Sequence, residues 1–194
     1  MVTGVQTCAL PIWAAENGHI EIVEFLATLE DEKRRVYPSQ GGANGAAKNG
    51  HVEIVKFFAT LADEKCRVYP SQASADWAAR NGQIEIVKFL ATLEDEKRRV
   101  YPSQESAYRA AKNGHIEIVK FLATLEDEKR RVYPSQQGAN EAAMNGHIEI
   151  LEFLASLKDK KRRVLPSQRG ANRAAQNRHP EVLDWLRMKG LLSK

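Results

Sequence analysis

The fold is decided by the stretch Asn113-Gly114-His115-Ile116-Glu117-Ile118-Val119-Lys120-Phe121-Leu122-Ala123-Thr124-Leu125, and near-copies of it recur every 32 residues along the chain. The asparagine that opens each copy falls at Asn17, Asn49, Asn81, Asn113, Asn145 and Asn177. Self-similarity at a fixed period of this size predicts stacked repeats, each too small to fold without a neighbour. We therefore expect a single elongated domain.

Each copy predicts a pair of helices. Ser103 is placed as the N-cap of a first helix, because its hydroxyl can accept a hydrogen bond from an otherwise unpaired backbone N–H. Residues 113–114, Asn-Gly, end that helix, since both residue types tolerate the left-handed conformation of a helix C-terminus. A second helix then begins at His115 or Ile116.

The apolar residues of both helices predict how the pair is buried. Small side chains on the first helix let two helices approach closely, and they are Ala107, Ala110 and Ala111. Larger ones form a broad face on the second helix at helical spacing, and they are Ile116, Ile118, Val119, Phe121, Leu122 and Leu125. The predicted fold class is all-α, an α-solenoid of stacked antiparallel helix pairs.

A charged segment follows the second helix and is expected to continue it. Its order is Glu126-Asp127-Glu128-Lys129-Arg130-Arg131, acids first and bases last. This order favours a helix, because Glu126 faces Arg130 and Asp127 faces Arg131 at the four-residue spacing. Pro134 then disfavours helical geometry in the residue before it and stops the helix.

The stretch Ala110-Ala111-Lys112-Asn113-Gly114-His115-Ile116-Glu117-Ile118-Val119-Lys120-Phe121-Leu122 closely resembles the ankyrin repeat, whose hallmark is Ala-Ala-x-x-Gly-His-Leu-Glu-Ile-Val-Lys-Leu-Leu. The resemblance covers every copy from Ala14 onward. It implies stacked helix pairs whose inner helices and loops form a concave surface for other proteins, usually without catalysis. The family's Thr-Pro-Leu-His motif and Gly-Ala-Asp finger loop are missing here, so we expect recognition to rest on helices rather than on projecting fingers.

The period sets the expected boundaries within the chain. A truncated first repeat at 14–38 is followed by repeats at 39–70, 71–102, 103–134 and 135–166, and by a C-terminal capping repeat at 167–194. The last repeat places Arg187 where the one before has Ala155, and Lys189 where it has Leu157. Its outward side is therefore polar, as a terminal repeat requires.

The first residues match something other than a repeat. Residues 2–12, Val-Thr-Gly-Val-Gln-Thr-Cys-Ala-Leu-Pro-Ile, resemble the translation of a common sequencing-adapter oligonucleotide. We expect residues 1–13 to be an assembly scar, with Ala14 the first wholly genomic residue and the repeats a fragment of a longer, metagenomic gene. A native segment that matches by chance is the alternative. On the first interpretation Cys8 carries no redox information.

Composition restricts the class of protein. The chain has 194 residues, 43% of them hydrophobic and 28% charged, and no apolar run approaches the ~18 residues of a membrane span. The net charge is +4, but residues 150–194 carry 11 Lys and Arg against 4 Asp and Glu. Such asymmetry permits attraction to an acidic partner, a nucleic acid or an anionic membrane surface, but the interpretation that we favour is a solvated basic end without a partner.

Variation among near-identical copies indicates a candidate binding surface, which we call the variable stripe. It comprises three positions of the first helix, spaced by four and three residues so that they share one helical face. They are Gly41, Ala73, Glu105, Gln137 and Arg169; Gly45, Trp77, Arg109, Glu141 and Arg173; and Lys48, Arg80, Lys112, Met144 and Gln176. Aromatic residues and Arg dominate interface energetics, so Trp77, Tyr108 and Arg109 are the expected anchors. Neutral drift on a solvated face, and a Tyr108 side chain that points inward, are the alternatives.

The partner-binding residues predicted on this basis form one set. They are Gly45, Trp77, Arg80, Glu105, Tyr108, Arg109, Lys112, Gln137, Glu141, Met144, Arg169 and Arg173.

No pattern of catalytic or metal-binding residues stands out. His19, His51, His115, His147 and His179 recur at the repeat spacing, and helices ~8–10 Å apart hold them too far apart to share one zinc at ~2 Å bonds. Cys66 replaces an Arg and is expected to be an inert thiol. We expect a non-catalytic protein-protein interaction scaffold without cofactor or metal, monomeric and cytoplasmic, with an unidentified partner protein on the concave face.

The rival hypothesis is binding of an anionic polymer, such as a nucleic acid, or of a membrane surface. The basic clusters that would line one edge are Lys33-Arg34-Arg35, Lys97-Arg98-Arg99, Lys129-Arg130-Arg131 and Lys160-Lys161-Arg162-Arg163. Against this hypothesis, the acids of each cluster offset most of its bases.

Overall fold

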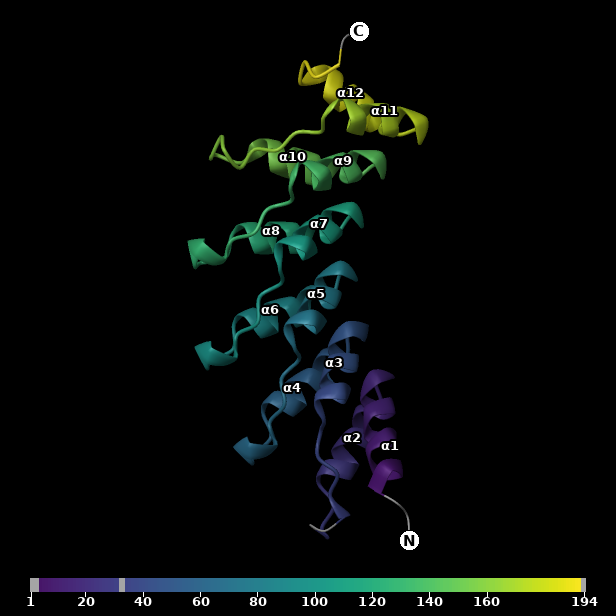
Figure 1. The fold of residues 1–194 in the computed structure, drawn as a ribbon, viewed down its shortest axis with the longest axis vertical. Coiled ribbons are helices and arrows are strands. Elements are labelled where there is room, and N and C mark those ends of the chain that lie inside the picture. The colour runs from purple at the N-terminus through teal and green to yellow at the C-terminus, as the bar shows by residue number, and fades with distance from the viewer. Residues whose placement is uncertain (1–3, 32–33, 193–194) are drawn as a thin grey trace. The chain divides into compact units, whose positions relative to one another are not determined.

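The computed structural model describes residues 4–31 and 34–192. Within these ranges the chain forms α-helices and short 3-10 helices and no strand, which confirms the all-α prediction (Figure 1). The chain divides into two compact units, and the boundary lies between Tyr101 and Pro102. No helix in the described ranges is both long enough and apolar enough to cross a membrane.

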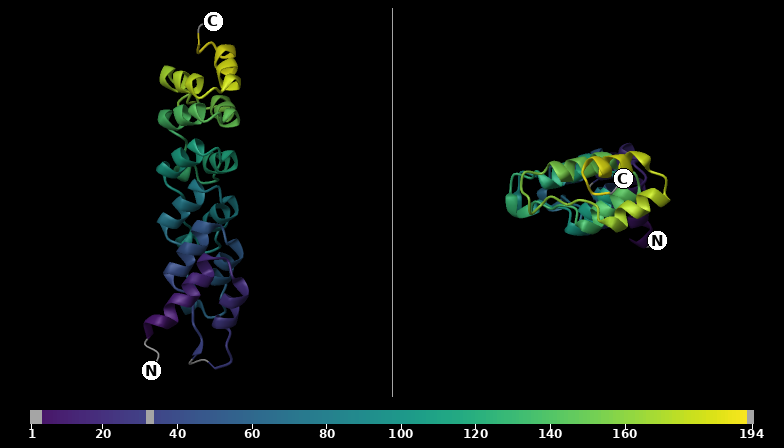
Figure 2. Two further views of the ribbon diagram at one scale, coloured as in Figure 1. Left: turned by 90° about the vertical axis from the view of Figure 1, so that its right-hand side faces the viewer. Right: turned by 90° about the horizontal axis from the view of Figure 1, so that it is seen from above.

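The first unit contains α1 (Gly4–Glu16), α2 (Ile20–Ala27), α3 (Gln40–Asn49), α4 (Val52–Ala59), α5 (Gln72–Arg80) and α6 (Ile84–Ala91). The second unit contains α7 (Gln104–Lys112), α8 (Ile116–Ala123), α9 (Gln136–Met144), α10 (Ile148–Ser156), α11 (Gln168–Gln176) and α12 (Pro180–Met188). Odd-numbered helices are the first helices of the repeats and even-numbered helices are the second. Within each unit, first helices contact first helices and second helices contact second helices, so each unit has two helical layers (Figure 2).

The first helices begin and end where the sequence predicts. Ser39 caps α3, its hydroxyl accepting from the backbone N–H of Gly42 at 3.2 Å. Ser103 holds the same N-cap position before α7, but the predicted capping bond is absent, because its hydroxyl lies 3.4 Å from the hydroxyl of Ser106 and accepts from no backbone N–H of the helix. Gly114, two residues after the end of α7, takes a φ of +84°.

The buried residues are those of the predicted faces. On α7, Ala107, Ala110 and Ala111 are fully buried. On α8 and just beyond it, Ile118, Val119, Leu122 and Leu125 are buried, while Ile116 and Phe121 are half-buried. Burial of each large side chain contributes about 1.5–3 kcal/mol, so apolar contacts between helices hold the repeats together.

Within each unit, one backbone carbonyl joins a repeat to the next, as the second unit shows. The carbonyl of Lys112, in the last turn of α7, accepts from the Nδ2 of Asn145 at 2.8 Å and from the Nε2 of His147 at 3.1 Å. A Cβ at Gly114 would lie 2.7 Å from Cε1 of His147, so the imidazole occupies the space that glycine leaves. Gly114 therefore meets two demands, a positive φ and room for the ring.

The surroundings of the imidazole at this site shift its pKa. Burial lowers the pKa of His147, and the nearby His115 and His179 lower it further, although the hydrogen bond to the Lys112 carbonyl acts in the opposite direction. Neutral imidazole is therefore the form that the fold favours. The histidine is a structural group that fills the gap over a glycine.

The predicted extension of the second helices is wrong. Helix α8 ends at Ala123, and Thr124 turns the chain, its hydroxyl donating to the carbonyl of Lys120 at 2.8 Å. Asp127 then caps a separate 3-10 helix (Glu128–Arg130), accepting from the N–H of Lys129 at 3.0 Å. Aspartate stabilises a helix start more than a helix interior, so the segment begins a new turn and does not extend α8.

The ion pairs in this segment differ correspondingly from the expected four-residue pairs. Asp127 pairs with Arg130 at 3.4 Å and Glu128 pairs with Arg131 at 2.7 Å, three residues apart in each case. The predicted pairs, from Glu126 to Arg130 and from Asp127 to Arg131, required an α-helix here. Because this segment forms a capped 3-10 turn, residues three positions apart face each other.

The segment folds back onto the end of α8 and satisfies its free carbonyls. The N–H of Val132 donates to the carbonyl of Leu122 at 3.2 Å, and the hydroxyl of Tyr133 donates to the carbonyl of Ala123 at 3.0 Å. The Nε of Arg131 donates to the carbonyl of Leu125 at 2.6 Å. These groups replace the intrahelical donors that a helix C-terminus lacks.

Residues 4–13, predicted to be an assembly scar, lie in α1. This helix takes the place of a first helix beside α3, and a Cβ at Gly42 would lie 3.4 Å from the Cβ of Ala15. It includes Pro11 in its interior. Residues 1–3 of the predicted scar lie outside the described residues. Its adapter origin stays a prediction.

We predict that His147 makes stability depend on pH. Its pKa is lowered in the folded state, so its contribution is complete above its unfolded pKa, near 6.5, and is lost as pH falls from there toward the folded pKa. Gln83 holds the equivalent position over Gly50, so glutamine fits this site. The variant His147→Gln should fold and should lose less stability than the parent between about pH 6.5 and 5. Urea unfolding at several pH values measures this, and equal pH slopes would contradict it.

We also predict unequal costs for two neighbouring bases. Arg131→Ala should lower the free energy of unfolding by about 1–2 kcal/mol, because the carbonyl of Leu125 and the carboxylate of Glu128 lose their donor. Lys129→Ala, an exposed control two residues away, should cost less than about 0.5 kcal/mol. Chemical denaturation of both variants tests this, and equal effects would refute the structural role of Arg131.

Candidate functional site

The variable stripe lies on the first helices, α3 and α5 in the first unit and α7, α9 and α11 in the second. Its three positions alternate with the buried alanines on the same helices, so the stripe faces away from the second helices. At the first stripe position, Glu105, Gln137 and Arg169 are exposed. Arg80, Arg109, Lys112, Glu141, Met144 and Arg173 are half-buried.

In the first unit the stripe presents an aromatic ring between two cations. Trp77 on α5 is 42% exposed. The Nζ of Lys48 lies 5.4 Å from the centre of its ring, and the guanidinium carbon of Arg80 lies 4.6 Å from it. Cation–π contacts of this kind contribute about 0.5–1 kcal/mol at exposed sites, so the cations hold the indole in place without covering it.

Gly45 occupies the position of Trp77 in the preceding repeat, and its surroundings explain its size. A Cβ at Gly45 would lie 3.0 Å from the Cβ of Glu16 on α1. The glycine therefore allows α1 and α3 to approach closely. Its part in binding a partner stays a prediction.

In the second unit the stripe is a network of paired charges. The Nε of Arg109 lies 2.7 Å from a carboxylate oxygen of Glu105, and its guanidinium carbon lies 5.6 Å from the centre of the Tyr108 ring. Glu141 pairs with Lys112 at 3.4 Å and with Arg173 at 3.7 Å. These charged side chains are already paired with one another within the protein.

The stripe residues follow one contact rule between neighbouring repeats. The third stripe position of one repeat contacts the middle position of the next. The three pairs are Lys48 with Trp77, Lys112 with Glu141, and Met144 with Arg173, whose Nη1 lies 3.3 Å from the methionine sulfur. The sequence could not show this rule, because it depends on which positions face each other across a repeat boundary.

Tyr108 differs from the expected anchor. Its side chain is half-buried, and a Cβ at Gly138 would lie 3.7 Å from its ring and 3.6 Å from its Cα. The tyrosine thus packs against α9 with part of its surface. Trp77 is therefore more open to a partner than Tyr108 is.

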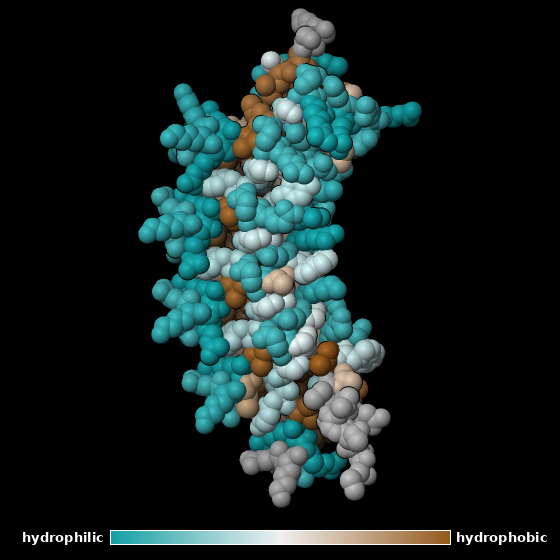
Figure 3. All heavy atoms as spheres, viewed as in Figure 1, coloured by the Kyte–Doolittle hydropathy of each residue, from teal (hydrophilic) through white to brown (hydrophobic). Residues whose placement is uncertain are grey.

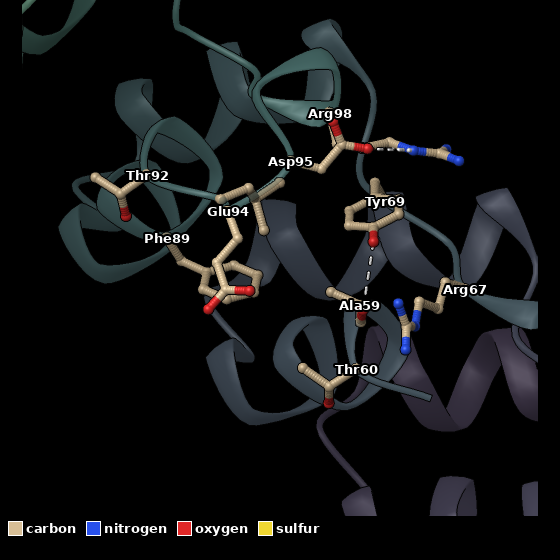
Figure 4. A pocket seen from close by; sticks show the side chains of 10 residues that line it. Ala59, Thr60, Arg67, Tyr69, Phe89, Thr92, Glu94, Asp95 and Arg98 are labelled. Carbon is tan, nitrogen blue, oxygen red and sulfur yellow. Dashed lines mark hydrogen bonds and ion pairs between the residues drawn. The ribbon is translucent and has the colours of Figure 1, made fainter. Parts of the chain in front are cut away.

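A cavity of about 380 Å³ lies on the other side of the first unit, between the C-terminal ends of α4 and α6 (Figure 4). Arg98 lies over the ring of Tyr69 at 5.0 Å and pairs with Asp95 at 3.7 Å, while the Tyr69 hydroxyl donates to the Ala59 carbonyl at 3.4 Å. A cavity of about 320 Å³ recurs in the second unit beside Tyr133 and the equivalent residues Asp159 and Arg162. Because it recurs with the repeat, we attribute it to stacking.

Cys66 stands where Arg98 and Arg162 stand in other repeats. Its sulfur lies 3.5 Å from a carboxylate oxygen of Asp63. Burial and the negative charge of Asp63 raise the pKa of the Cys66 thiol, although a hydrogen bond with Tyr37 acts in the opposite direction. This shift favours the protonated thiol, which is the less nucleophilic form, and the inertness of Cys66 stays a prediction. In the described ranges, no group of three or more His, Cys, Asp or Glu could hold a metal ion.

The basic clusters protrude as hydrophilic loops beside the second helices (Figure 3). In all four of them the last arginine is committed to the fold, its Nε donating to the carbonyl six residues earlier. These arginines are Arg35, Arg99, Arg131 and Arg163, and Arg67 makes the same bond at 2.7 Å in the equivalent loop of the second repeat. Arg67, Arg99 and Arg131 also pair with a glutamate three residues earlier. Lys33, in the first cluster, lies outside the described residues.

Comparison with known proteins places these helix pairs in a family. Residues 76–164 match the family model described as ankyrin repeats, in three copies. A search of curated proteins finds no match. Ankyrin repeats are generally protein-protein interaction modules, and the family is typically non-enzymatic. Residues 76–164 therefore match the ankyrin repeat family, and α1–α4 before this range and α11–α12 after it repeat the same pattern of helix pairs.

Proposed function

We propose that the protein is a non-catalytic scaffold that binds a partner protein on the variable stripe, with Trp77 as the main anchor. The observation that supports this most is the 42% exposure of the indole, held between Lys48 and Arg80. Interfaces gain most of their affinity from a few aromatic and Arg side chains. An exposed tryptophan that the fold already holds in place loses little side-chain entropy on binding.

The charged stripe of the second unit has a different part in this proposal. Glu141 is 14% exposed at its side chain and is paired with Lys112 and Arg173, so a partner gains little from it. The exposed first positions, Gln137 and Arg169, are better placed to form a polar rim. We therefore assign affinity to the first unit and polar complementarity to the second.

The absence of catalysis is part of the proposal. The larger cavity is lined by no His, Cys or Lys, and its Arg98 and Asp95 are paired with each other. His147 is held against the carbonyl of Lys112, so it is not available as a base. A monomeric state and a cytoplasmic location remain predictions.

The rival function, binding of an anionic polymer or membrane surface, has less support. Arg67, Arg99 and Arg131 are bound to carbonyls and glutamates of their own loops. In the clusters that end at Arg35, Arg99 and Arg131, three acids offset three bases, whereas residues 158–163 hold one acid and five bases. Few cations outside residues 158–163 are therefore left to release counterions from a polyanion.

We predict that Trp77→Ala removes the main binding surface and leaves the fold intact. Gly45 shows that a small residue is accepted at this position. Peptides selected on the parent protein from a random display library should concentrate on this surface. Their affinity should fall roughly 30-fold on the variant, the loss typical of an interface anchor.

The matched control is Lys88→Ala, on the second helix of the same repeat, where Lys88 pairs only weakly with Glu85 at 3.7 Å. It should leave the affinity of the same peptides unchanged. If the selected peptides bind Trp77→Ala as well as they bind the parent, the stripe is not the binding surface.

We further predict no measurable binding to generic double-stranded DNA, even at about 50 mM salt, where electrostatic binding is strong. Fluorescence anisotropy with a labelled duplex tests this. Binding that weakens steeply as salt rises would instead support the polyanion hypothesis.

A further inference from the structure

One loop of the second unit differs in charge from its equivalents, and we call it the basic loop. Its sequence is Lys158-Asp159-Lys160-Lys161-Arg162-Arg163, with one acid and five bases. Residues 30–35, 94–99 and 126–131 each read Glu-Asp-Glu-Lys-Arg-Arg, with three acids and three bases. The formal charge is therefore +4 in the basic loop and zero in these three, because Lys158 and Lys160 stand in place of glutamates.

The lysine at position 160 removes an ion pair that the preceding loop has. There, Glu128 pairs with Arg131 at 2.7 Å, and the Nε of Arg131 is bound to a backbone carbonyl. In the basic loop, Arg163 donates to the equivalent carbonyl of Leu157, but Lys160 holds the position of the glutamate. The guanidinium of Arg163 thus keeps its structural bond and loses its counter-charge.

The lysines of the basic loop are also without a counter-charge. In the part of the chain that the structure describes, the ammonium groups of Lys158, Lys160 and Lys161 form no ion pair, and all three residues are exposed. The acid of the loop, Asp159, pairs with Arg162 at 3.1 Å. Like charges this close repel one another, so a bound anion would remove a repulsion that the fold otherwise carries.

A cavity of about 320 Å³ lies between the basic loop and the loop before it. Its lining includes Lys158 and Arg162 from the basic loop, and Arg131 and Tyr133 from the chain before it. The Nη1 of Arg162 donates to the Tyr133 hydroxyl at 2.6 Å, and the guanidinium carbon lies 4.7 Å from the centre of the tyrosine ring. These contacts hold a guanidinium in place beside the cavity.

The equivalent cavity of the first unit provides a comparison. Its charged lining is balanced, with two bases and two acids, which are Arg67, Arg98, Glu94 and Asp95. Lys158 takes the place of Glu94 in the second unit, where three bases and two acids line the cavity. Stacking of repeats accounts for both cavities, but of these two only the second carries excess positive charge.

The surroundings of the basic loop favour a short acidic partner over a nucleic acid. A nucleic acid is a long polyanion whose charges continue along the chain. The loop before the basic loop presents exposed carboxylates at Glu126, Asp127 and Glu128. These would repel a polyanion that extended beyond the basic loop, whereas a short acidic segment ends within it.

An anionic membrane surface is a poorer match as well. A cluster of Lys and Arg attracts such a surface, but stable attachment needs a second, apolar anchor. The apolar residues that flank the basic loop, Leu157 and Val164, are half-buried in the fold. They are therefore not free to insert between lipids.

We propose that the basic loop and the cavity beside it are a docking site for a short segment of a partner protein that is rich in Asp and Glu. Carboxylates of the segment pair with the exposed lysines, and one of them enters the cavity between Lys158 and Arg162. The sequence alone favours a solvated basic end, and the structure adds the cavity and the missing counter-charges. The loops lie beside the second helices (Figure 3), so this site is separate from the variable stripe on the first helices.

The test uses a fluorescein-labelled peptide of alternating Asp and Glu residues, whose affinity is measured by fluorescence anisotropy. The neutral-loop variant, Lys158→Glu with Lys160→Glu, gives the basic loop the sequence of residues 94–99, which this fold already accommodates. At about 50 mM salt it should bind the peptide at least 10-fold more weakly than the parent, since two attractions become repulsions. At about 0.5 M salt the difference should disappear.

Two further variants separate the site from the net charge of the protein. Both add two lysines to the neutral-loop variant and restore the net charge of +4. In the first, Glu94→Lys with Glu96→Lys gives residues 94–99 the sequence of the basic loop, and peptide binding should return. In the second, Glu117→Lys with Glu149→Lys places the lysines at exposed positions on two different helices, and binding should stay weak.

Several results would overturn the proposal. They are equal binding of the peptide to the parent and the neutral-loop variant, no recovery with lysines at 94 and 96, and equal recovery with the dispersed lysines. Tighter binding of duplex DNA, or of vesicles of phosphatidylcholine and phosphatidylserine, that the neutral-loop variant abolishes would assign the loop to a nucleic acid or a membrane. The neutral-loop variant should bind peptides selected on the variable stripe as the parent does, so failure here and failure of the stripe proposal are distinguishable.

Discussion

Within each unit the structure depends on a backbone carbonyl at the end of a first helix, which accepts hydrogen bonds from the next repeat. A helix leaves its last carbonyls unsatisfied, and one that is buried without a partner costs about 1–3 kcal/mol. Here the carbonyl of Glu16 accepts from Asn49 at 2.8 Å and from His51 at 3.0 Å, as that of Lys112 does in the second unit. The interface can form only when glycine leaves room for the imidazole.

The helix pairs could be predicted because each of their signals is local. A serine cap, inward alanines and an Asn-Gly end act within one turn, so their spacing in the sequence is their spacing in space. The loop after α8 could not be predicted in this way. Its acids and bases also fit a continued helix, and the contact that decides against it, from Arg131 to the Leu125 carbonyl, spans six residues of irregular chain. No helical or strand period marks such a contact.

The candidate site shows the same limit. The sequence identified the stripe from its variation, and Trp77 is exposed there as expected. The sequence could not show that Lys112 and Glu141 form an ion pair. If neighbouring repeats were shifted by one residue relative to each other, other residues would be paired. Variation that first suggested selection by a partner is thus partly accounted for by contacts between neighbouring repeats.

The sizes of the individual contributions to stability explain how a fold of near-identical repeats tolerates a variable surface. Each exposed or half-exposed ion pair of the stripe contributes at most about 1 kcal/mol, whereas each buried Ile or Leu of a second helix contributes about 1.5–3 kcal/mol. Exchanging a stripe residue therefore leaves most of the stability in place, as the presence of Gly45, Trp77 and Arg109 at one position illustrates. Stability resides in the faces between repeats and in the shared carbonyl. The stripe is consequently the part of each first helix whose chemistry can change without unfolding the repeat.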